Sequence, residues 1–365
     1  MALLRRLLPL LCALLAGGAL AAAPPPTPPP LTVHFFDVGQ GDAALIVSPA
    51  GRTVLIDGGP PEAGRALAAR LRTLVKGPLD LVILTHPHLD HLGGLPAALK
   101  AVGAKRFMDP GFDHPSRAYA KLLDEVGARV GQVLTPVPDP RNPDALVQVG
   151  LGEGVSLSIL WPRAPQQPFL GHTRSDANSN SIILRLTYGT TALLFMGDAE
   201  EATEERLLAD GRTLTASVLK VAHHGGGYSS SVPFLQAVQP RYAIVSCGKG
   251  NDYGHPSPAA LQRLKAAGAQ VLRTDQQGEV TVVSDGAQVR VSAQRPAPGA
   301  SAVKPPGAGK AAPAHKLRYV ALKGSPVFHR EDCPALARAT TKERTVYSTR
   351  EAAAREHRPA KDCNP

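Results

Sequence analysis

The chain has 365 residues, which exceeds the size of an average domain and predicts one principal domain with accessory segments. Four cysteines are too few for a fold built on a disulfide framework, so the core must be hydrophobic. The formal net charge of +10 creates a field that attracts anionic polymers, such as nucleic acid or cell-envelope polymers, without choosing among them.

Residues 1–23 have the three parts of a secretory signal peptide. Two arginines precede an apolar stretch from Leu7 to about Leu20, and three alanines follow it. The apolar run is shorter than the roughly 20 residues needed to cross a bilayer, which favours export with cleavage over a membrane anchor. We therefore expect a secreted or extracytoplasmic protein without a membrane span after cleavage, and a stiff Pro-rich spacer over residues 24–30.

From Leu31 the sequence alternates in the manner of short strands that Gly-rich turns separate. We expect a β-meander over residues 31–38, 43–48 and 53–56. An amphipathic helix is expected next, over residues 62–74, and then a continuous apolar strand over residues 79–84 that is buried on both faces.

The second half repeats the strand-rich pattern. Strands are expected over residues 155–160, 181–188 and 191–196, followed by a helix over 200–208. Strand and helix segments then alternate to a closing hairpin, over residues 217–221, 232–238, 242–246, 258–267, 271–273 and 278–291. This order favours an α/β fold in which two mixed sheets carry helices outside, an αββα sandwich over residues 31–294.

The densest group of metal-ligand side chains directly follows the expected strand at 79–84. Three histidines and a carboxylate lie within six residues: His86, His88, Asp90 and His91. A turn at a strand end can surround two metal ions with such side chains, because the strand holds the backbone while the side chains project into a cleft. Packing gives no reason for three imidazoles on a surface turn, so we interpret the segment as a metal site rather than an incidental polar turn.

The pattern His-x-His-x-Asp-His after a hydrophobic strand resembles the signature of the metallo-β-lactamase superfamily. Asp57 in Leu-Ile-Asp-Gly-Gly and Asp198 in Phe-Met-Gly-Asp lie in further matching segments. The resemblance implies a metal-dependent hydrolase in which Asp198 bridges two metals and Asp57 braces the His-rich turn from behind. The chemistry agrees, because a carboxylate offers two oxygens to two cations and ligating histidines need an outer hydrogen-bond acceptor.

Residues 31–291 resemble, in particular, the hydrolase domain of competence DNA-uptake channel proteins of the ComEC type. The segments that carry this resemblance are Phe36–Asp42, Asn180-Ser181, Leu219–Gly225 and Tyr253–Pro258. By this resemblance we also expect Asp37 and Asp42 to support the ligands from outside the metal shell.

The resemblance implies two ligand sets that share Asp198. One metal is assigned to His86, His88, His223 and Asp198, and the other to Asp90, His91, His255 and Asp198. Asp90, Asp198 and His224 are expected to take part in catalysis. His224 follows the same strand as His223 and is expected to point the other way, toward substrate or water, with support of a ligand as the alternative. Nitrogen and oxygen donors without thiolate favour zinc and also admit manganese or iron.

The loops that follow supply the candidates for substrate contact. These are Lys249 and Asn251 before His255, together with Asn180 and Ser229; a plain surface loop is the alternative for residues 225–231. Two cations can activate water as a nucleophile at neutral pH, so the resemblance implies a secreted phosphodiesterase that cleaves DNA. The alternatives are a phosphocholine or other cell-envelope phosphoesterase, and a non-catalytic binding protein on a hydrolase scaffold.

The C-terminal residues form a separate small module. Residues 295–315 are rich in Pro, Ala, Gly and Lys and are expected to be a linker. Residues 316–365 carry 11 Lys or Arg against 6 Asp or Glu and resemble the metal-binding module of Ada-type DNA-repair proteins. Because Ala360 stands where that family has a cysteine, a disulfide between Cys333 and Cys363 is favoured over a zinc site. Attachment to DNA or to the cell envelope and a purely stabilising role are equally favoured.

Overall fold

The computed structural model describes residues 29–152, 154–296, 318–330, 336 and 343–360. The chain divides into two compact units, Met1–Gly299 and Ala300–Pro365. The expected signal peptide, nearly all of the expected linker and the two cysteines of the expected disulfide lie outside the described residues. In the described part of the chain, no helix has both the length and the apolar character needed to cross a membrane.

One large sheet is built mostly from the first half of the chain. Its strands are β1 (Leu31–Phe35), β2 (Ala44–Val47), β3 (Thr53–Ile56), β4 (Leu81–Ile83), β5 (Arg106–Met108), β6 (Gln132–Leu134), β14 (Val280–Ser284) and β15 (Val289–Ala293). Their order is β15-β14-β1-β2-β3-β4-β5-β6. Pairing is antiparallel from β15 to β3 and parallel from β3 to β6, so the expected meander is followed by parallel strands that need crossover connections.

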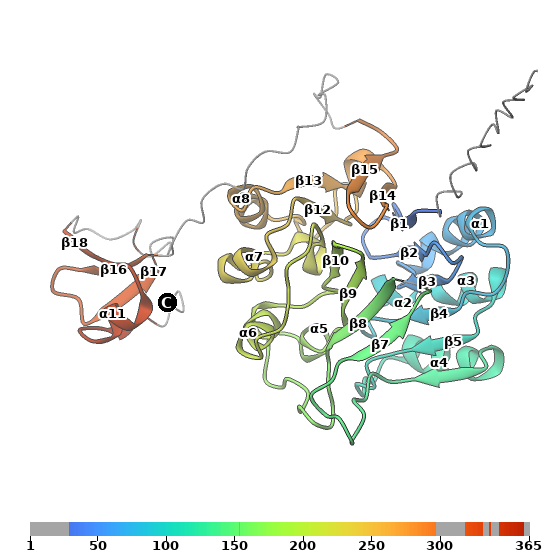
Figure 1. The fold of residues 1–365 in the computed structure, drawn as a ribbon, viewed down its shortest axis with the longest axis horizontal. Helices are drawn as coiled ribbons and strands as arrows, with labels where there is room; N and C mark the ends of the chain where they lie inside the picture. The colour runs from blue at the N-terminus through green and yellow to red at the C-terminus, as the bar shows by residue number, and fades with distance from the viewer. Residues whose placement is uncertain (1–28, 153, 297–317, 331–335, 337–342, 361–365) are drawn as a thin grey trace, which may run out of the picture. The chain divides into compact units, whose positions relative to one another are not determined.

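The second large sheet contains the strands of the second half. They are β7 (Val147–Gly150), β8 (Val155–Trp161), β9 (Ile183–Tyr188), β10 (Thr191–Phe195), β11 (Val218–Lys220), β12 (Tyr242–Val245) and β13 (Gln270–Arg273). Their order is β13-β12-β11-β10-β9-β8-β7, parallel from β10 to β13 and antiparallel from β10 to β7 (Figure 1).

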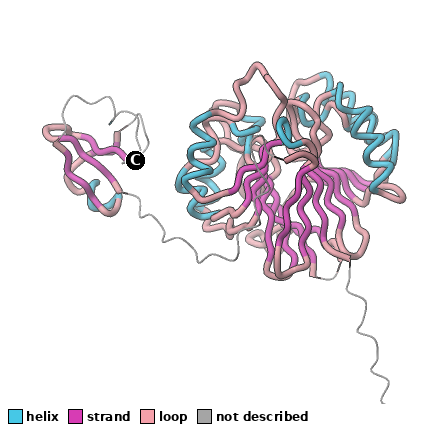
Figure 2. The backbone as a smooth tube through the Cα atoms, turned by 90° about the horizontal axis from the view of Figure 1, so that it is seen from above, coloured by secondary structure: helices cyan, strands magenta, loops and turns pink. Residues whose placement is uncertain are grey.

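The two sheets pack face to face with helices on their outer faces (Figure 2). Apolar side chains of both sheets fill the space between them, where the rings of Phe35 and Phe195 stack at 5.8 Å. The helices outside the first sheet are α1 (Gly64–Leu74), α3 (Leu95–Val102) and α4 (Arg117–Arg129), and those outside the second are α6 (Glu201–Ala209), α7 (Val232–Val238) and α8 (Pro258–Ala266). Apolar side chains of these helices pack against the outer faces of the sheets, which confirms the αββα sandwich.

Short helical turns complete this unit. They are the 3₁₀ turns Pro61–Ala63 and Ala222–Gly225 and the helices α2 (Leu89–Leu92), α5 (Asp176–Ser179) and α9 (Thr274–Gln277). Several follow directly on strands, and the segments after β3, β4, β10 and β11 carry the side chains of the candidate site. These strand ends lie at one edge of the sandwich because the strands are parallel to their neighbours.

The C-terminal unit contains a small sheet of order β18-β16-β17-β19. Its elements are β16 (Tyr319–Leu322), β17 (Val327–Arg330), β18 (Arg344–Tyr347), α11 (Arg350–Ala354) and β19 (Arg358–Pro359). Phe328 and Ala353 are buried in it. The two ring nitrogens of His357 lie 3.0 Å from the Ser325 carbonyl oxygen and 3.1 Å from the Tyr347 hydroxyl oxygen. The resemblance to Ada-type modules stays a prediction.

Candidate metal centre

Asp57 ties the end of β3 to the His-rich turn after β4. The Thr85 amide donates to Asp57 Oδ1 at 2.7 Å and the Thr85 hydroxyl donates to Oδ2 at 2.8 Å. His91 Nδ1 lies 2.8 Å from Asp57 Oδ2. The carboxylate therefore fixes the Nδ1–H tautomer of His91 and leaves Nε2 facing the site. Asp57 has φ 58°, a left-handed conformation that Asp and Asn tolerate better than most residues.

His86 and His88 form a close pair on the same turn. His86 Nε2 lies 3.1 Å from His88 Nδ1 and 3.8 Å from Asp198 Oδ2. Burial and the neighbouring charge of His91 hold the pKa of His86 well below its usual range. A neutral imidazole is the form that ligates a metal, so the local environment keeps His86 ready for that role.

Asp198 lies at the centre of the cluster, after β10. Gly197 precedes it with φ +49°, and a Cβ there would crowd the Ser181 side chain. The Asp198 amide donates to Ser181 Oγ at 3.2 Å. Asp198 Oδ1 lies 3.3 Å from His91 Nε2, whereas Oδ2 faces His86. Its two oxygens therefore point at different imidazoles, which is the geometry a bridging carboxylate needs.

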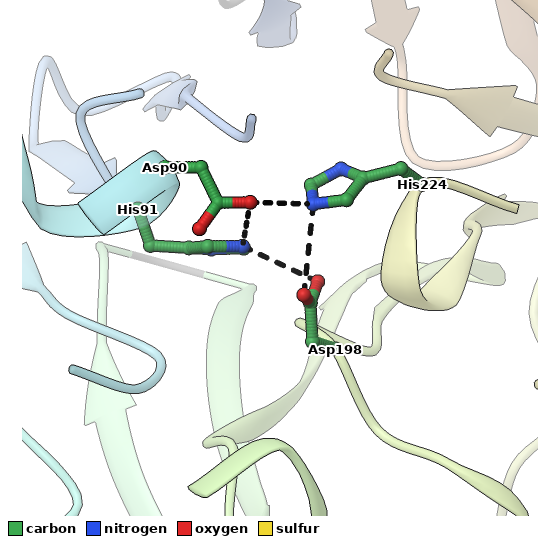
Figure 3. Close-up of side chains that lie close together, drawn as sticks. All are labelled: Asp90, His91, Asp198 and His224. Atoms are coloured by element: carbon green, nitrogen blue, oxygen red, sulfur yellow. Dashed lines mark hydrogen bonds and ion pairs between the residues drawn. The ribbon is translucent and has the colours of Figure 1, made fainter. Parts of the chain in front are cut away.

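Four side chains converge most closely: Asp90, His91, Asp198 and His224 (Figure 3). One ligand atom from each lies within 4.8 Å of all the others. His224 Nε2 is 3.2 Å from Asp90 Oδ2 and 3.5 Å from Asp198 Oδ2. The structure thus brings His224, rather than the expected His255, into the group with Asp90 and His91.

His223 and His224 do not continue the strand β11, and this changes where their rings point. Both have left-handed backbone conformations, with φ 49° and 53°, inside the 3₁₀ turn Ala222–Gly225. The prediction that they point in opposite directions assumed a strand and is wrong: His223 Nε2 also faces Asp198, at 3.8 Å from Oδ2. Such conformations cost about 1–3 kcal/mol per residue and persist only where surrounding contacts impose them.

Asp42 holds His224 from behind. His224 Nδ1 lies 3.2 Å from Asp42 Oδ1 and 3.0 Å from the Ser246 carbonyl, and Lys220 Nζ pairs with Asp42 Oδ2 at 2.6 Å. Burial alone would lower the pKa of His224, but Asp198 and Asp42 outweigh it and raise the pKa well above its usual value. Asp42 therefore orients the His224 ring, and its support of a metal ligand stays a prediction of the resemblance.

His255 lies at the rim of the cluster. Its ring centroid is 5.3 Å from that of His223 and 6.0 Å from that of His224. Gln40 Nε2 approaches its Nδ1 at 3.5 Å. Burial and the charge of His223 lower the pKa of His255 to about 4, so the ring is neutral at pH 7.

Glu200 is a site residue that the sequence analysis missed. It is buried, and its Oε1 lies 3.5 Å from His223 Nδ1. It therefore stands to His223 as Asp57 stands to His91 and Asp42 to His224. The available signal was its position two residues after Asp198, at the start of α6, where an acidic side chain also suits the helix dipole.

Three expected substrate residues instead hold the scaffold together. Asn180 is fully buried, and its amide group makes three hydrogen bonds to backbone groups. Ser229 is buried and donates to a backbone carbonyl at 2.8 Å. Asn251 donates to two carbonyls of its own loop and accepts from two amides of that loop. Backbone groups thus occupy the amide groups of both asparagines and the one donor of Ser229, so these side chains serve the scaffold rather than the opening of the site.

Two further expectations have different outcomes. Asp37 does not support the ligands: it is exposed, and its described partner is Arg295, at 3.5 Å. The strand β1 ends at Phe35, so Asp37 belongs to the loop beyond it and turns outward. Lys249 is exposed in the loop that leads to His255, and its contact with substrate stays a prediction.

The donor set fits divalent cations. His91 Nε2 and Asp198 Oδ1 are buried and find no hydrogen-bond partner among the described residues. Burial alone would lower the pKa of His91, but Asp198, Asp57 and Asp90 raise it well above its usual value. The negative charge that favours a proton on this imidazole equally favours a cation beside it. Imidazole and carboxylate donors suit zinc and admit manganese.

Two sheets with outer helices and a histidine–carboxylate cluster at their strand ends define the class of metal-dependent hydrolases with this sandwich fold. The comparison with known families agrees: the profile of the metallo-beta-lactamase superfamily matches residues 14–168. The chain belongs to this superfamily.

Competence and recombination proteins are among the known proteins to which the chain is similar. The chain is 31% identical over 269 residues to ComE operon protein 3 of Bacillus subtilis (strain 168), covering 68% of this chain and 32% of that protein. It is 31% identical over 249 residues to competence protein ComA of Neisseria gonorrhoeae, covering 67% and 31%. It is 31% identical over 258 residues to recombination protein 2 of Haemophilus influenzae, covering 68% and 28%. The chain thus spans about a third of the length of these relatives.

Proposed function

We propose that this protein is a binuclear metal-dependent phosphodiesterase that cleaves DNA outside the cytoplasm. The observation that carries the proposal is the position of Asp198 among four imidazoles: its Oδ1 faces His91, and its Oδ2 faces His86, His223 and His224. Relatives involved in competence favour DNA as the substrate, and the basic charge of the chain favours a polyanion. The leader-like N-terminus favours export.

Two ligand sets share Asp198 in this proposal. His86, His88 and His223 would hold one cation with it, and Asp90, His91 and His224 would hold the other. When bound, such a pair of cations lowers the pKa of water and stabilises charge on the attacked phosphorus. No serine or cysteine nucleophile is then required.

The protein side chains would orient the ligands and the substrate. Asp57, Asp42 and Glu200 fix the ring orientations of His91, His224 and His223, so the cage is organised before substrate arrives. Asp90 is the open carboxylate, with 33% of its side chain exposed against 3% for Asp198. The Asp90 side of the cluster is therefore the side open to solvent and to substrate, whereas Asp198 is shielded. The neutral ring of His255 at the rim can accept or donate a hydrogen bond.

The test is a hydrolysis assay on the purified full chain loaded with Zn²⁺ or Mn²⁺. DNA and bis-nitrophenyl phosphate should both be cleaved, and Asp90→Asn should reduce the rate at least about 100-fold, the loss expected when one charge of a preorganised site is removed. Phosphocholine esters and envelope polymers serve as competing substrates. Intact DNA with the loaded protein would refute the nuclease, and full activity of Asp90→Asn would refute the metal mechanism.

A further inference from the structure

Three of the most exposed large apolar side chains lie in the segments that carry the candidate ligands. Among the described residues, six such side chains stand out: Leu89, Val133, Val137, Tyr228, Tyr253 and Val346. Leu89 lies between two expected ligands, and the two tyrosines lie in the loops that follow His224 and precede His255. Exposed apolar groups gathered at a functional site mark a binding surface.

The loop that carries Tyr228 is held rigidly from two sides. The buried Glu204 carboxylate accepts the amides of Ser230 and Ser231, at 2.5 and 2.8 Å. The guanidinium of Arg263 donates to three carbonyls of the same loop, those of Gly227, Ser229 and Ser230. The Gly-rich segment is therefore clamped, and Tyr228 protrudes from it with 58% exposure.

The loop that carries Tyr253 is fixed in a similar way. The Asn251 side chain makes four hydrogen bonds within this loop, one of them to the Tyr253 amide. Tyr253 is 73% exposed, and its ring stacks on the ring of His255 at 5.8 Å with an interplanar angle of 24°. The Tyr253 ring therefore extends the flat surface of the His255 ring into solvent.

Tyr228 is linked to the candidate metal site through the Arg174 side chain. The Arg174 guanidinium lies 3.5 Å from the Tyr228 ring centroid. Arg174 Nε is 3.9 Å from Glu200, whose other oxygen faces His223. At 3.9 Å the contact with Glu200 is too long for a hydrogen bond, so the N–H groups of the exposed guanidinium can donate to a phosphate.

We infer that Tyr228, Tyr253 and Arg174 form a stacking rim that receives unpaired bases of a single-stranded nucleic acid next to the cage. This inference rests on the proposed phosphodiesterase function. Aromatic faces accept any base without sequence preference, and an arginine beside them holds the backbone. Bases in a duplex are already stacked and cannot use such a surface. Preformed loops lower the entropy lost on binding, which explains clamps around two otherwise exposed rings.

The test measures binding by the full metal-loaded chain with a fluorescent phosphorothioate oligothymidylate of about 12 nucleotides, within the usual range of single-strand site sizes. Tyr228→Leu and Tyr253→Leu remove the flat ring but keep an apolar side chain. Each should weaken single-strand binding about tenfold, or about 1.4 kcal/mol. Tyr228→Phe and Tyr253→Phe should retain binding, and Val137→Ala is the control for an exposed apolar residue outside the rim.

The outcomes separate this inference from the proposed function. A duplex of the same length and vesicles of phosphatidylglycerol are measured in parallel. Leucine variants that bind the single strand like the wild type, or that lose duplex or vesicle binding equally, would overturn the rim while leaving DNA cleavage intact. A wild-type protein that neither binds nor cleaves nucleic acid would overturn both.

Discussion

Replacing Asp57 with Asn tests whether a buried carboxylate behind the cage sets its metal affinity. Asn accepts the same left-handed backbone as Asp, so φ 58° is not strained by the change. At least one of the three contacts of the carboxylate would then face an NH₂ group instead of an oxygen, and His91 would lose its charged partner. Loss of such an outer partner lowers metal affinity about 10- to 100-fold, which is about 1.4–2.8 kcal/mol.

The measurement is competition for Zn²⁺ between the protein and a chromophoric chelator at pH 7. Asp80→Asn is the matched control, since Asp80 is also a buried carboxylate but lies before β4, paired with Lys105 at 2.8 Å. The control should lose stability and keep its zinc affinity. If Asp57→Asn binds zinc like the wild type, the carboxylate does not orient His91 for a metal, and the proposed support of the cage is wrong.

Other perturbations probe stability. The pKa of Glu279 is lowered to about 2, since contacts with His34 and Arg70 outweigh burial, so its stabilisation is complete above about pH 4.5 and lost as pH falls toward 2. Glu279→Gln should therefore cost about 1–2 kcal/mol in denaturant unfolding at pH 7, after solvent screening, and nothing at pH 2. Glu204→Gln should cost about 1–3 kcal/mol, because its amide turns a donor toward a loop N–H, and a normal thermal midpoint would contradict this. Gly94→Ala should prevent soluble expression, because the new Cβ overlaps the Gly58 carbonyl oxygen. Chelation should lower the unfolding free energy by about 2.7 kcal/mol relative to zinc at 100 times its Kd, and no shift in calorimetry would argue against a resident metal.

The sequence pattern predicts the sandwich and many of its strands, because hydrophobic periodicity reports burial directly. The strand at 81–83 and the helix at 64–74 lie within the expected ranges, and the closing hairpin extends to Ala293, past its expected end at residue 291. The sequence pattern predicts no helix or strand between residues 95 and 150, although this region contains two helices and three strands. Two of those strands have only three residues, too few to establish a period.

The directions in which the site side chains point could not be predicted from the sequence. The turn at His223 and His224 departs from strand geometry, and alternation therefore misplaced His224. Asn180 and Asn251 looked available for substrate because their hydrogen-bond partners are backbone groups, which are invisible in a residue pattern. Motif spacing pointed to the candidate ligands that the fold brings together, whereas the contact between Glu200 and His223 spans 23 positions and follows from the fold alone.

The two halves of the candidate cage come from different sheets. The turn bearing His91 follows the first sheet, whereas Asp198 and His224 follow strands of the second. A cation bound by His91, Asp198 and His224 would cross-link the two sheets at the edge where their strands end. During synthesis this cross-link cannot form before residue 224 has been made and the two sheets have packed together. Metal binding would therefore accompany the completion of folding.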